Sequence, residues 1–234
     1  MTDWRKSLYE CLKDFDAPRL LSNTELQTFA SNNGIDVSPR QIQIFIERMK
    51  ELDILSPVRR GLYLNNRAWP APTYAEAANR IRAGSVVSLL TVLGDAGVMN
   101  NSTSNIYSVL PASEGTEPYL APVMSEDVNF YFSRMKREIL EAGDPNDRLV
   151  PMLPYKRATP EAAIVHWLYL ANTRRSALKE PDTQCDVELL DLDRLRRLAR
   201  ASALESEVFS WIDRCRKRGE DDDNHTHWGP ARSL

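Results

Sequence analysis

The stretch from Ser38 to Asn66 constrains the fold of this chain most, because a helix pattern there is followed by two short strand patterns and a basic turn. Ser38 can cap the helix, Pro39 suits its first position, and Gln41 lies where a capping box has its second partner. Apolar side chains recur at helical spacing and predict one buried face, made of Ile42, Phe45, Ile46, Met49 and Leu52. The pattern therefore predicts a helix with one face in a core and the other exposed.

The exposed side of this helix carries the side chains of Arg40, Gln43, Ile44, Glu47 and Arg48. Arginine and glutamine near the N-terminal end of such a helix pair with guanine and adenine edges in the major groove of DNA. The residues of this helix that we predict to contact DNA are Arg40, Gln41, Gln43, Ile44 and Arg48.

Two strand patterns follow the helix. Ile54-Leu55 suits a first strand, which Ser56-Pro57 interrupts, and residues 62–64 suit a second strand at the edge of a sheet. Between them, residues 58–61 (Val-Arg-Arg-Gly) predict a turn, in which Gly61 can take the positive φ that such turns often need. This order predicts a β-hairpin, or wing, behind the helix.

The predicted wing is basic. Arg59 and Arg60 at its tip, and Arg67 after its second strand, are predicted to bind phosphates or to enter the minor groove. Residues 38–67 hold six basic and three acidic side chains, and six minus three gives a formal charge of +3. An ordinary solvated hairpin is the alternative, because runs of charge usually form exposed faces. The order of the elements favours DNA binding.

Two helix patterns precede this stretch, over residues 3–15 and 22–32, and Asn33-Gly34 predicts the end of the second. Ser22 and Glu25 have the spacing of a second capping box. The predicted order of helix, helix, turn, helix and wing is that of a winged helix-turn-helix. We therefore predict that residues 1–70 form a DNA-binding domain of this type.

A proline-bearing connector, residues 68–73, predicts the domain boundary, so that residues 71–218 form a second, larger domain. Helices are predicted over residues 74–83, 86–96, 159–170, 191–202 and 205–218, and strands over residues 105–110, 119–124 and 127–132. Residues 219–234 are acidic and then mixed, without an apolar period, and predict a disordered tail. The predicted fold class is helix-rich α+β.

Composition limits the kind of protein. The formal net charge is −3, so the chain is not a non-specific polycation, and any contact with nucleic acid must come from local patches. The three cysteines, Cys11, Cys185 and Cys215, are odd in number and far apart, which predicts neither a disulfide framework nor a zinc site. The polar N-terminus predicts no signal peptide, and the longest apolar run, Val86–Leu93, is too short to span a bilayer. We expect a cytoplasmic protein.

Sequence motifs of catalysis are absent. The chain has no glycine-rich phosphate loop, no G-x-S-x-G and no H-E-x-x-H. His166 lies inside an apolar helix and is predicted to be a core residue, whereas His225 and His227 lie in the predicted tail. We therefore predict no catalytic residue, no metal site and no cofactor.

The helix predicted over residues 191–202 carries four arginines: Arg194, Arg196, Arg197 and Arg200. They can form a second basic surface for nucleic acid or for an acidic partner. Alternatively, they form a solvated face with local pairs to Asp191, Asp193 and Glu205. The sequence leaves both interpretations open.

Three segments taken together resemble one known family. They are the wing at residues 58–64 (Val-Arg-Arg-Gly-Leu-Tyr-Leu), the helix at residues 85–97, and residues 157–170, which read R-A-T-P-E-A-A-I-V-H-W-L-Y-L. This pattern resembles the AbiEi family of antitoxins from type IV toxin–antitoxin (abortive infection) systems, over roughly residues 5–212. The chain departs from the family at Ala162, where a lysine is common, and at His166, where the family has a Leu-Leu-Asp type of run.

The resemblance implies a bacterial protein whose N-terminal winged helix binds inverted repeats in its own promoter and represses its operon. It implies a larger C-terminal domain for antitoxicity, against a nucleotidyltransferase-like toxin, without implying a stable complex with that toxin. We expect a monomer in solution or a weak dimer on DNA. The alternative is a winged-helix regulator of another operon, and an enzyme acting on nucleic acid is a third hypothesis without convincing residues.

Overall fold

The computed structural model describes residues 4–100, 104–113, 117–174, 178–181 and 183–226, with side chains described as far as Arg218. The chain divides into two compact units. Unit 1 comprises Met1–Ile81 and Val123–Phe130, and unit 2 comprises Arg82–Pro122 and Tyr131–Leu234. Both helices and antiparallel strands are present, which confirms the predicted α+β class.

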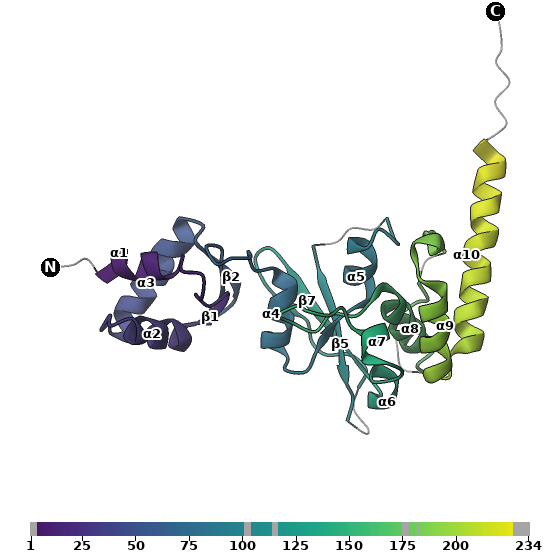
Figure 1. The fold of residues 1–234 in the computed structure, drawn as a ribbon, viewed down its shortest axis with the longest axis horizontal. Coiled ribbons are helices and arrows are strands. Elements are labelled where there is room, and N and C mark those ends of the chain that lie inside the picture. Colours follow the sequence, from purple (N-terminus) through teal and green to yellow (C-terminus); the bar gives the residue numbers. More distant parts are fainter. Residues whose placement is uncertain (1–3, 101–103, 114–116, 175–177, 182, 227–234) are drawn as a thin grey trace, which may run out of the picture. The chain divides into compact units, whose positions relative to one another are not determined.

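Unit 1 packs helices against a small antiparallel sheet, shown in purple and blue in Figure 1. Its sheet has the strand order β1-β3-β2. The core between helices and sheet contains Leu8, Leu26, Phe45, Ile46 and Leu55, each at most 1% exposed. The elements are α1 (Trp4–Cys11), β1 (Leu20–Ser22), α2 (Asn23–Asn32), α3 (Pro39–Glu51), β2 (Leu55–Arg59), β3 (Leu62–Asn65) and α4 (Tyr74–Ile81).

Both predicted capping boxes are confirmed. The Ser22 N–H donates to Oε2 of Glu25 over 2.8 Å, and the Ser38 N–H donates to Oε1 of Gln41 over 2.8 Å. In each box the serine hydroxyl accepts a hydrogen bond from the backbone of its partner, so two orphan donors are satisfied at each helix start. Leu52, predicted in the buried face of α3, is instead its C-cap and is 45% exposed, because the helix ends one residue before it.

The hairpin differs in detail from the prediction. Strand β2 does not stop at Ser56-Pro57 but continues to Arg59, with a β-bulge between Pro57 and Arg59, so the turn is only Arg60-Gly61. Pro57 is tolerated because β2 is an edge strand of the sheet. Strand β3, predicted at an edge, is central, because β1 pairs with its other side. Gly61 has φ of +76°, as predicted.

Helix α4 belongs to unit 1, although the sequence predicted a boundary at residue 70. The Glu76 carboxylate, 6% exposed, accepts from Nε of Arg19 at 3.1 Å and from Nη2 of Arg19 at 2.7 Å. Arg19 also donates to the carbonyl of Pro70 over 2.6 Å. The Glu76 carboxylate therefore holds the connector and α4 against the loop before β1 through Arg19.

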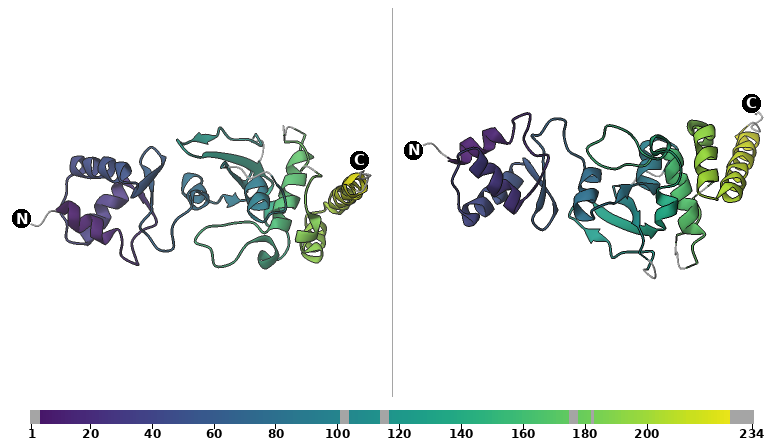
Figure 2. Two further views of the ribbon diagram at one scale, coloured as in Figure 1. Left: turned by 90° about the horizontal axis from the view of Figure 1, so that it is seen from above. Right: turned by 60° about the horizontal axis from the view of Figure 1, so that its bottom comes forward.

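Unit 2 packs helices beside a sheet whose strands have the order β4-β5-β7-β6. The tip of the β6–β7 hairpin, residues 123–130, clusters with unit 1. Helix α8 contacts both α5 and α9, and α10 contacts α8 and α9 (Figures 1 and 2). The elements of this sheet and of the rest of unit 2 are β4 (Val86–Val87), α5 (Leu89–Asp95), β5 (Ile106–Pro111), β6 (Val123–Met124, within unit 1), β7 (Asn129–Met135), α6 (Arg137–Leu140), α7 (Pro145–Arg148), α8 (Pro160–Ala171), the 3-10 helix η1 (Val187–Leu189), α9 (Leu192–Ala201) and α10 (Glu205–Thr226).

Several predicted bounds in unit 2 are wrong. The helix predicted over residues 86–96 begins as strand β4, because Val86 and Val87 pair with β5. The strand predicted over residues 119–124 is reduced to β6, with Tyr119 forming a single bridge to Ser133. Helix α10 continues to Thr226, through half of the predicted disordered tail, because propagating a formed helix adds one backbone hydrogen bond per residue without needing an apolar period. The rest of that tail lies outside the described residues.

Helix α8 forms the centre of unit 2. Thr159 caps it by accepting a hydrogen bond from the Ala162 N–H over 3.2 Å. His166 is 3% exposed, and its Nδ1 lies 2.9 Å from Oγ of Ser88. Burial, with a smaller effect of the nearby Arg148 charge, lowers the pKa of His166 to about 3. The prediction of a satisfied core histidine is confirmed.

Removing the Glu76 carboxylate will destabilise unit 1. We expect Glu76→Ala to lower the free energy of unfolding by about 2–3 kcal/mol, because Arg19 loses its partner in a partly buried site. Urea unfolding followed by circular dichroism measures the change. The control is Glu10→Ala, which removes an exposed pair with Lys13 and should cost about 0.5 kcal/mol or less. Equal effects of the two substitutions would contradict the role of Glu76.

The buried His166 will make the fold sensitive to acid. The folded pKa lies near 3 and the ordinary pKa near 6.5, so the unfolded chain binds a proton first as the pH falls, and stability is lost between these values. At pH 4.5 the loss should be on the order of 2 kcal/mol. Unfolding of the wild type and of His166→Gln between pH 7 and pH 4.5 tests this. A pH slope that is the same in both proteins would show that His166 is protonated in the fold.

Candidate nucleic-acid interface

The exposed face of α3 carries most of the residues predicted to contact DNA. Arg40, Gln43 and Arg48 are exposed, and Ile44 is an apolar side chain with 50% exposure. Gln41 is only partly available, because its Oε1 accepts hydrogen bonds from Ser38 N–H and Oγ at 2.8 and 2.9 Å. Four of the five predicted residues of α3 are thus presented to solvent without a capping role.

A groove with a volume of about 620 Å³ runs between α3 and the turn at Arg60-Gly61, and we call it the α3–turn groove. Gln43, Ile44 and Arg48 line it from the helix, and Arg60 lines it from the turn. Glu47 and Glu51 also line it, so it is not uniformly basic. The fold therefore brings together one predicted arginine of the turn with three predicted residues of the helix.

Arg59 lies on the other side of the turn. Together with Arg60 and Lys50 it lines a neighbouring concave surface of about 450 Å³, which also includes Met124 and Glu126 of the 123–130 hairpin. This hairpin is attached within unit 1, because Oγ of Ser125 donates to the carbonyl of Pro57 over 3.3 Å. The acidic Glu126 beside the arginines of the turn was not foreseen, since the pairing of these segments is non-local.

A third concave surface, the α1–α3 groove of about 700 Å³, has Arg5, Lys6, Arg48 and Arg67 among its lining residues. Its apolar lining includes Ile44 and Leu52, two of the exposed large hydrophobic residues. Sequence reasoning missed Arg5 and Lys6. They follow Trp4 and precede Leu8, so the helical period of α1 already placed them off its buried face.

The charges on α3 are partly paired with one another. Nη1 of Arg48 lies 2.7 Å from Oε2 of Glu51, and Nζ of Lys50 lies 3.0 Å from Oε2 of Glu47. Both Arg48 and Glu51 have 63% exposed side chains, and such exposed pairs contribute about 0–1 kcal/mol. A phosphate can therefore displace the carboxylates at little cost. Within the described part of the chain, no ion pair involves Arg40, Arg59, Arg60 or Arg67.

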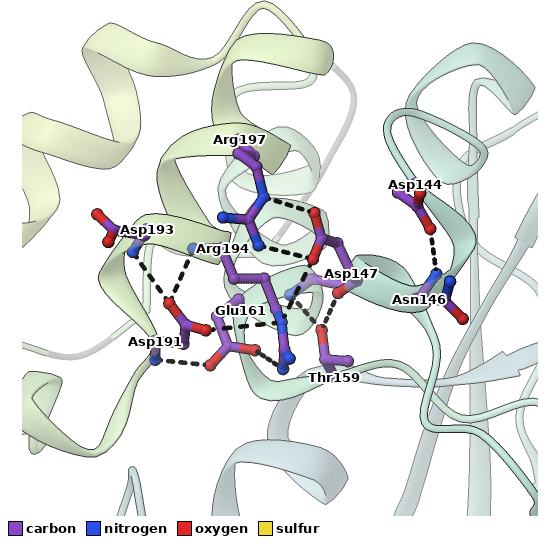
Figure 3. A network of polar contacts seen from close by, with 10 residues as sticks. Asp144, Asn146, Asp147, Thr159, Glu161, Asp191, Asp193, Arg194 and Arg197 are labelled. Atoms are coloured by element: carbon purple, nitrogen blue, oxygen red, sulfur yellow. Dashed lines mark hydrogen bonds and ion pairs between the residues drawn. The ribbon is translucent and has the colours of Figure 1, made fainter.

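The four arginines of α9 are all engaged by carboxylates. Arg197 binds Asp147 through two hydrogen bonds of 2.8 Å, and Figure 3 shows its guanidinium facing that carboxylate. Hydrogen bonding to Arg197 lowers the pKa of Asp147 against an opposing effect of burial. Arg196 lies 2.7 Å from Asp193, and Arg200 lies 3.1 Å from Glu205.

Arg194 reaches a buried acid. Its Nη1 lies 3.4 Å from Oε2 of Glu161, a residue that is only 3% exposed (Figure 3). Oε1 of Glu161 accepts a hydrogen bond from the Asp191 N–H over 2.9 Å. Arg194 and Arg197 thus belong to a network that joins α7, α8 and α9, whereas Arg196 and Arg200 pair at the surface with Asp193 and Glu205.

Among the residues that the structure describes, no three histidine, cysteine, aspartate or glutamate side chains gather as metal ligands. In that same part of the chain, no helix combines the length and the apolar character needed to cross a lipid bilayer.

Comparisons with known proteins bear on the fold. No family model matches the chain, and no curated protein matches it. A crystal structure of the RV2827C protein from Mycobacterium tuberculosis is similar, with a TM-score of 0.52 and 16% sequence identity, over 88% of this chain and 78% of that chain. At this identity the likeness extends to the fold alone.

The ion network of α9 will contribute stability through Arg194. We expect Arg194→Ala to lower the free energy of unfolding by about 2–3 kcal/mol, because it leaves the buried Glu161 carboxylate without its cation. The control Arg196→Ala removes an exposed pair and should change stability by about 0.5 kcal/mol or less. Urea unfolding measures both. Adding Glu161→Gln to Arg194→Ala should recover part of the loss, and no recovery would contradict a charge effect.

Proposed function

We propose that unit 1 is a winged helix-turn-helix domain that binds double-stranded DNA, with α3 in the major groove and the β2–β3 turn as the wing. The α3–turn groove supports this proposal most directly, since it collects Gln43, Arg48 and Arg60 on one exposed surface. Glutamine and arginine supply base contacts, and arginines on a turn supply phosphate or minor-groove contacts. An exposed Ile44 between them is suited to a thymine methyl group.

The α1–α3 groove extends the proposed interface. Arg5, Lys6 and Arg67 lie on the side of α3 away from the wing and share Arg48 and Ile44 with the α3–turn groove. Cations on both sides of a recognition helix can hold the two phosphate backbones that border a major groove. We assign Arg5 and Lys6 to phosphate contacts, in addition to the residues predicted from the sequence.

For the whole chain we propose an antitoxin of a type IV system that represses its own operon and counteracts a nucleotidyltransferase-like toxin. The resemblance of residues 58–64 and 157–170 to AbiEi antitoxins supports this proposal. The second motif has a structural explanation in this chain. Thr159 caps α8, and Glu161 binds Arg194 and the backbone at the start of α9. These residues of the motif therefore have structural roles in unit 2. The motif therefore does not identify the residues that would act on a toxin.

Removing the wing arginines will weaken DNA binding on all sequences. We expect Arg59→Ala with Arg60→Ala to reduce affinity for the upstream region and for a scrambled duplex alike, and to flatten the log–log salt slope by about two. Gel-shift titration over a salt series measures both quantities. The matched control is Arg196→Ala with Arg200→Ala, which removes two paired arginines of unit 2 and should leave the slope unchanged. An unchanged slope in the wing variant would remove the wing from the interface.

Removing a contact to a base will lower sequence preference rather than the affinity for all duplexes. We expect Gln43→Ala to reduce the preference for the upstream region over the scrambled duplex by about 1–3 kcal/mol at constant salt slope. An equal loss of affinity on both duplexes would identify Gln43 as a contact to the DNA backbone.

Co-expression with a neighbouring nucleotidyltransferase gene tests the antitoxin proposal. Growth arrest that continues in the presence of this protein would contradict that proposal and leave only the DNA-binding regulator.

A further inference from the structure

Two cysteines that are far apart in the sequence meet in unit 2. Sγ of Cys185 lies 3.2 Å from Sγ of Cys215, and the two residues are not joined by a disulfide. Cys215 lies on α10 and is 4% exposed, whereas Cys185 lies in the segment before η1 and is half-buried. The sequence carries no disulfide pattern, because only the fold brings these two residues together.

The backbone holds both cysteines in place. Cys185 forms an antiparallel bridge with Met99, and the next residue, Asp186, donates its N–H to the carbonyl of Val98 over 2.9 Å. Side chains of α10 contact the segment 180–188 on both sides of Cys215, through Trp211 to Pro181, Arg214 to Glu180 and Arg216 to Glu188. A disulfide has an S–S distance of about 2.05 Å, so the two sulfurs need to approach by only about 1 Å.

Solvent reaches the pair. A concave surface of about 370 Å³ includes both cysteines in its lining, together with Asn100, Thr183 and Arg218. A small oxidant or reductant can therefore contact Cys185, the more exposed thiol, while Cys215 lies behind it. A thiol pair with a close partner and solvent access is the arrangement found in residues that oxidise reversibly.

We propose that Cys185 and Cys215 are a redox modification site, at which a peroxide converts the two thiols into a disulfide that fastens α10 to the segment 180–188. The Cys185 thiolate attacks one peroxide oxygen, an S–O bond forms, the O–O bond breaks, and protonation releases water or an alcohol. The Cys215 thiolate then attacks the sulfenic sulfur, an S–S bond forms and a water leaves. The two electrons lost by the sulfurs reduce the peroxide. Two equivalents of a small thiol reverse the reaction.

The disulfide will stabilise unit 2. Closing the loop between residues 185 and 215 restricts the unfolded chain, which is the usual source of disulfide stabilisation. We expect the oxidised protein to unfold at a midpoint roughly 5 °C higher than the reduced protein. The effect is expected to disappear on addition of dithiothreitol.

The experiment treats the full chain with hydrogen peroxide and maps disulfide-linked peptides by mass spectrometry, before and after reduction. Cys185→Ser and Cys215→Ser remove the pair, and Cys11→Ser is the matched control. Cys11 lies in unit 1, and burial, followed by the Asp14 charge, raises the pKa of its thiol. We expect one linked peptide pair, joining Cys185 and Cys215, in the wild type and in the control, with the higher unfolding midpoint in both.

Three results would overturn the proposal. The first is over-oxidation of the wild-type thiols without a linked peptide. The second is a linked peptide containing Cys11 in place of either partner. The third is a linked pair that leaves the unfolding midpoint unchanged, because the bond would then not constrain α10. The first two results come from the wild type alone, so they hold even if a variant fails to fold.

Discussion

Unit 2 depends on a carboxylate buried at the start of its most apolar helix. Glu161 is 3% exposed, and burying such a charge is costly unless hydrogen bonds and a cation compensate it. The Asp191 N–H and Arg194 provide both, so the start of α9 must lie against the start of α8. Asp147 of α7 accepts hydrogen bonds from Arg197 of the same helix, which adds a third element to the network. The same carboxylates that fix this packing also neutralise Arg194 and Arg197 of α9.

Arginines therefore have two different roles in this chain. In unit 2 they hold elements together, and in unit 1 several lie exposed around α3 and the turn after β2. Within unit 1, Arg19 and Arg80 also have partners in the fold, since Glu76 engages Arg19 and Glu25 engages Arg80. Composition alone cannot separate these roles, because the formal net charge of −3 sums over both units. The partners of each arginine decide whether its charge is available to a polyanion.

Local signals were the ones that sequence analysis interpreted correctly. The caps at Ser22 and Ser38 and the positive φ of Gly61 depend on a few neighbouring residues, and all three are present. Contacts between distant residues were missed, because nothing in the spacing of Arg19 and Glu76, or of Cys185 and Cys215, indicates that they meet. Strand β1 was missed for the same reason, since three residues carry too short a pattern without their partner β3.

In the candidate site, too, the local features were predicted and the contacts between distant segments were not. The exposed and buried faces of α3 follow from its helical period, so Gln43, Ile44 and Arg48 were identified correctly as exposed. Gln41 was predicted both to cap the helix and to contact DNA, although its Oε1 is already occupied by the cap. Glu126 came from a hairpin far along the chain, and its place beside Arg59 and Arg60 follows only from the fold.

The edge of the sheet in unit 1 has a consequence for self-association. An exposed edge strand offers unpaired N–H and C=O groups to a second chain, and proteins commonly protect such edges. Strand β2 is protected twice, because Pro57 has no N–H to donate and its carbonyl accepts from Ser125. Two copies of unit 1 therefore cannot readily extend one sheet across β2. A second copy of unit 1 that extends this sheet would have to pair with β1, the strand at the other edge.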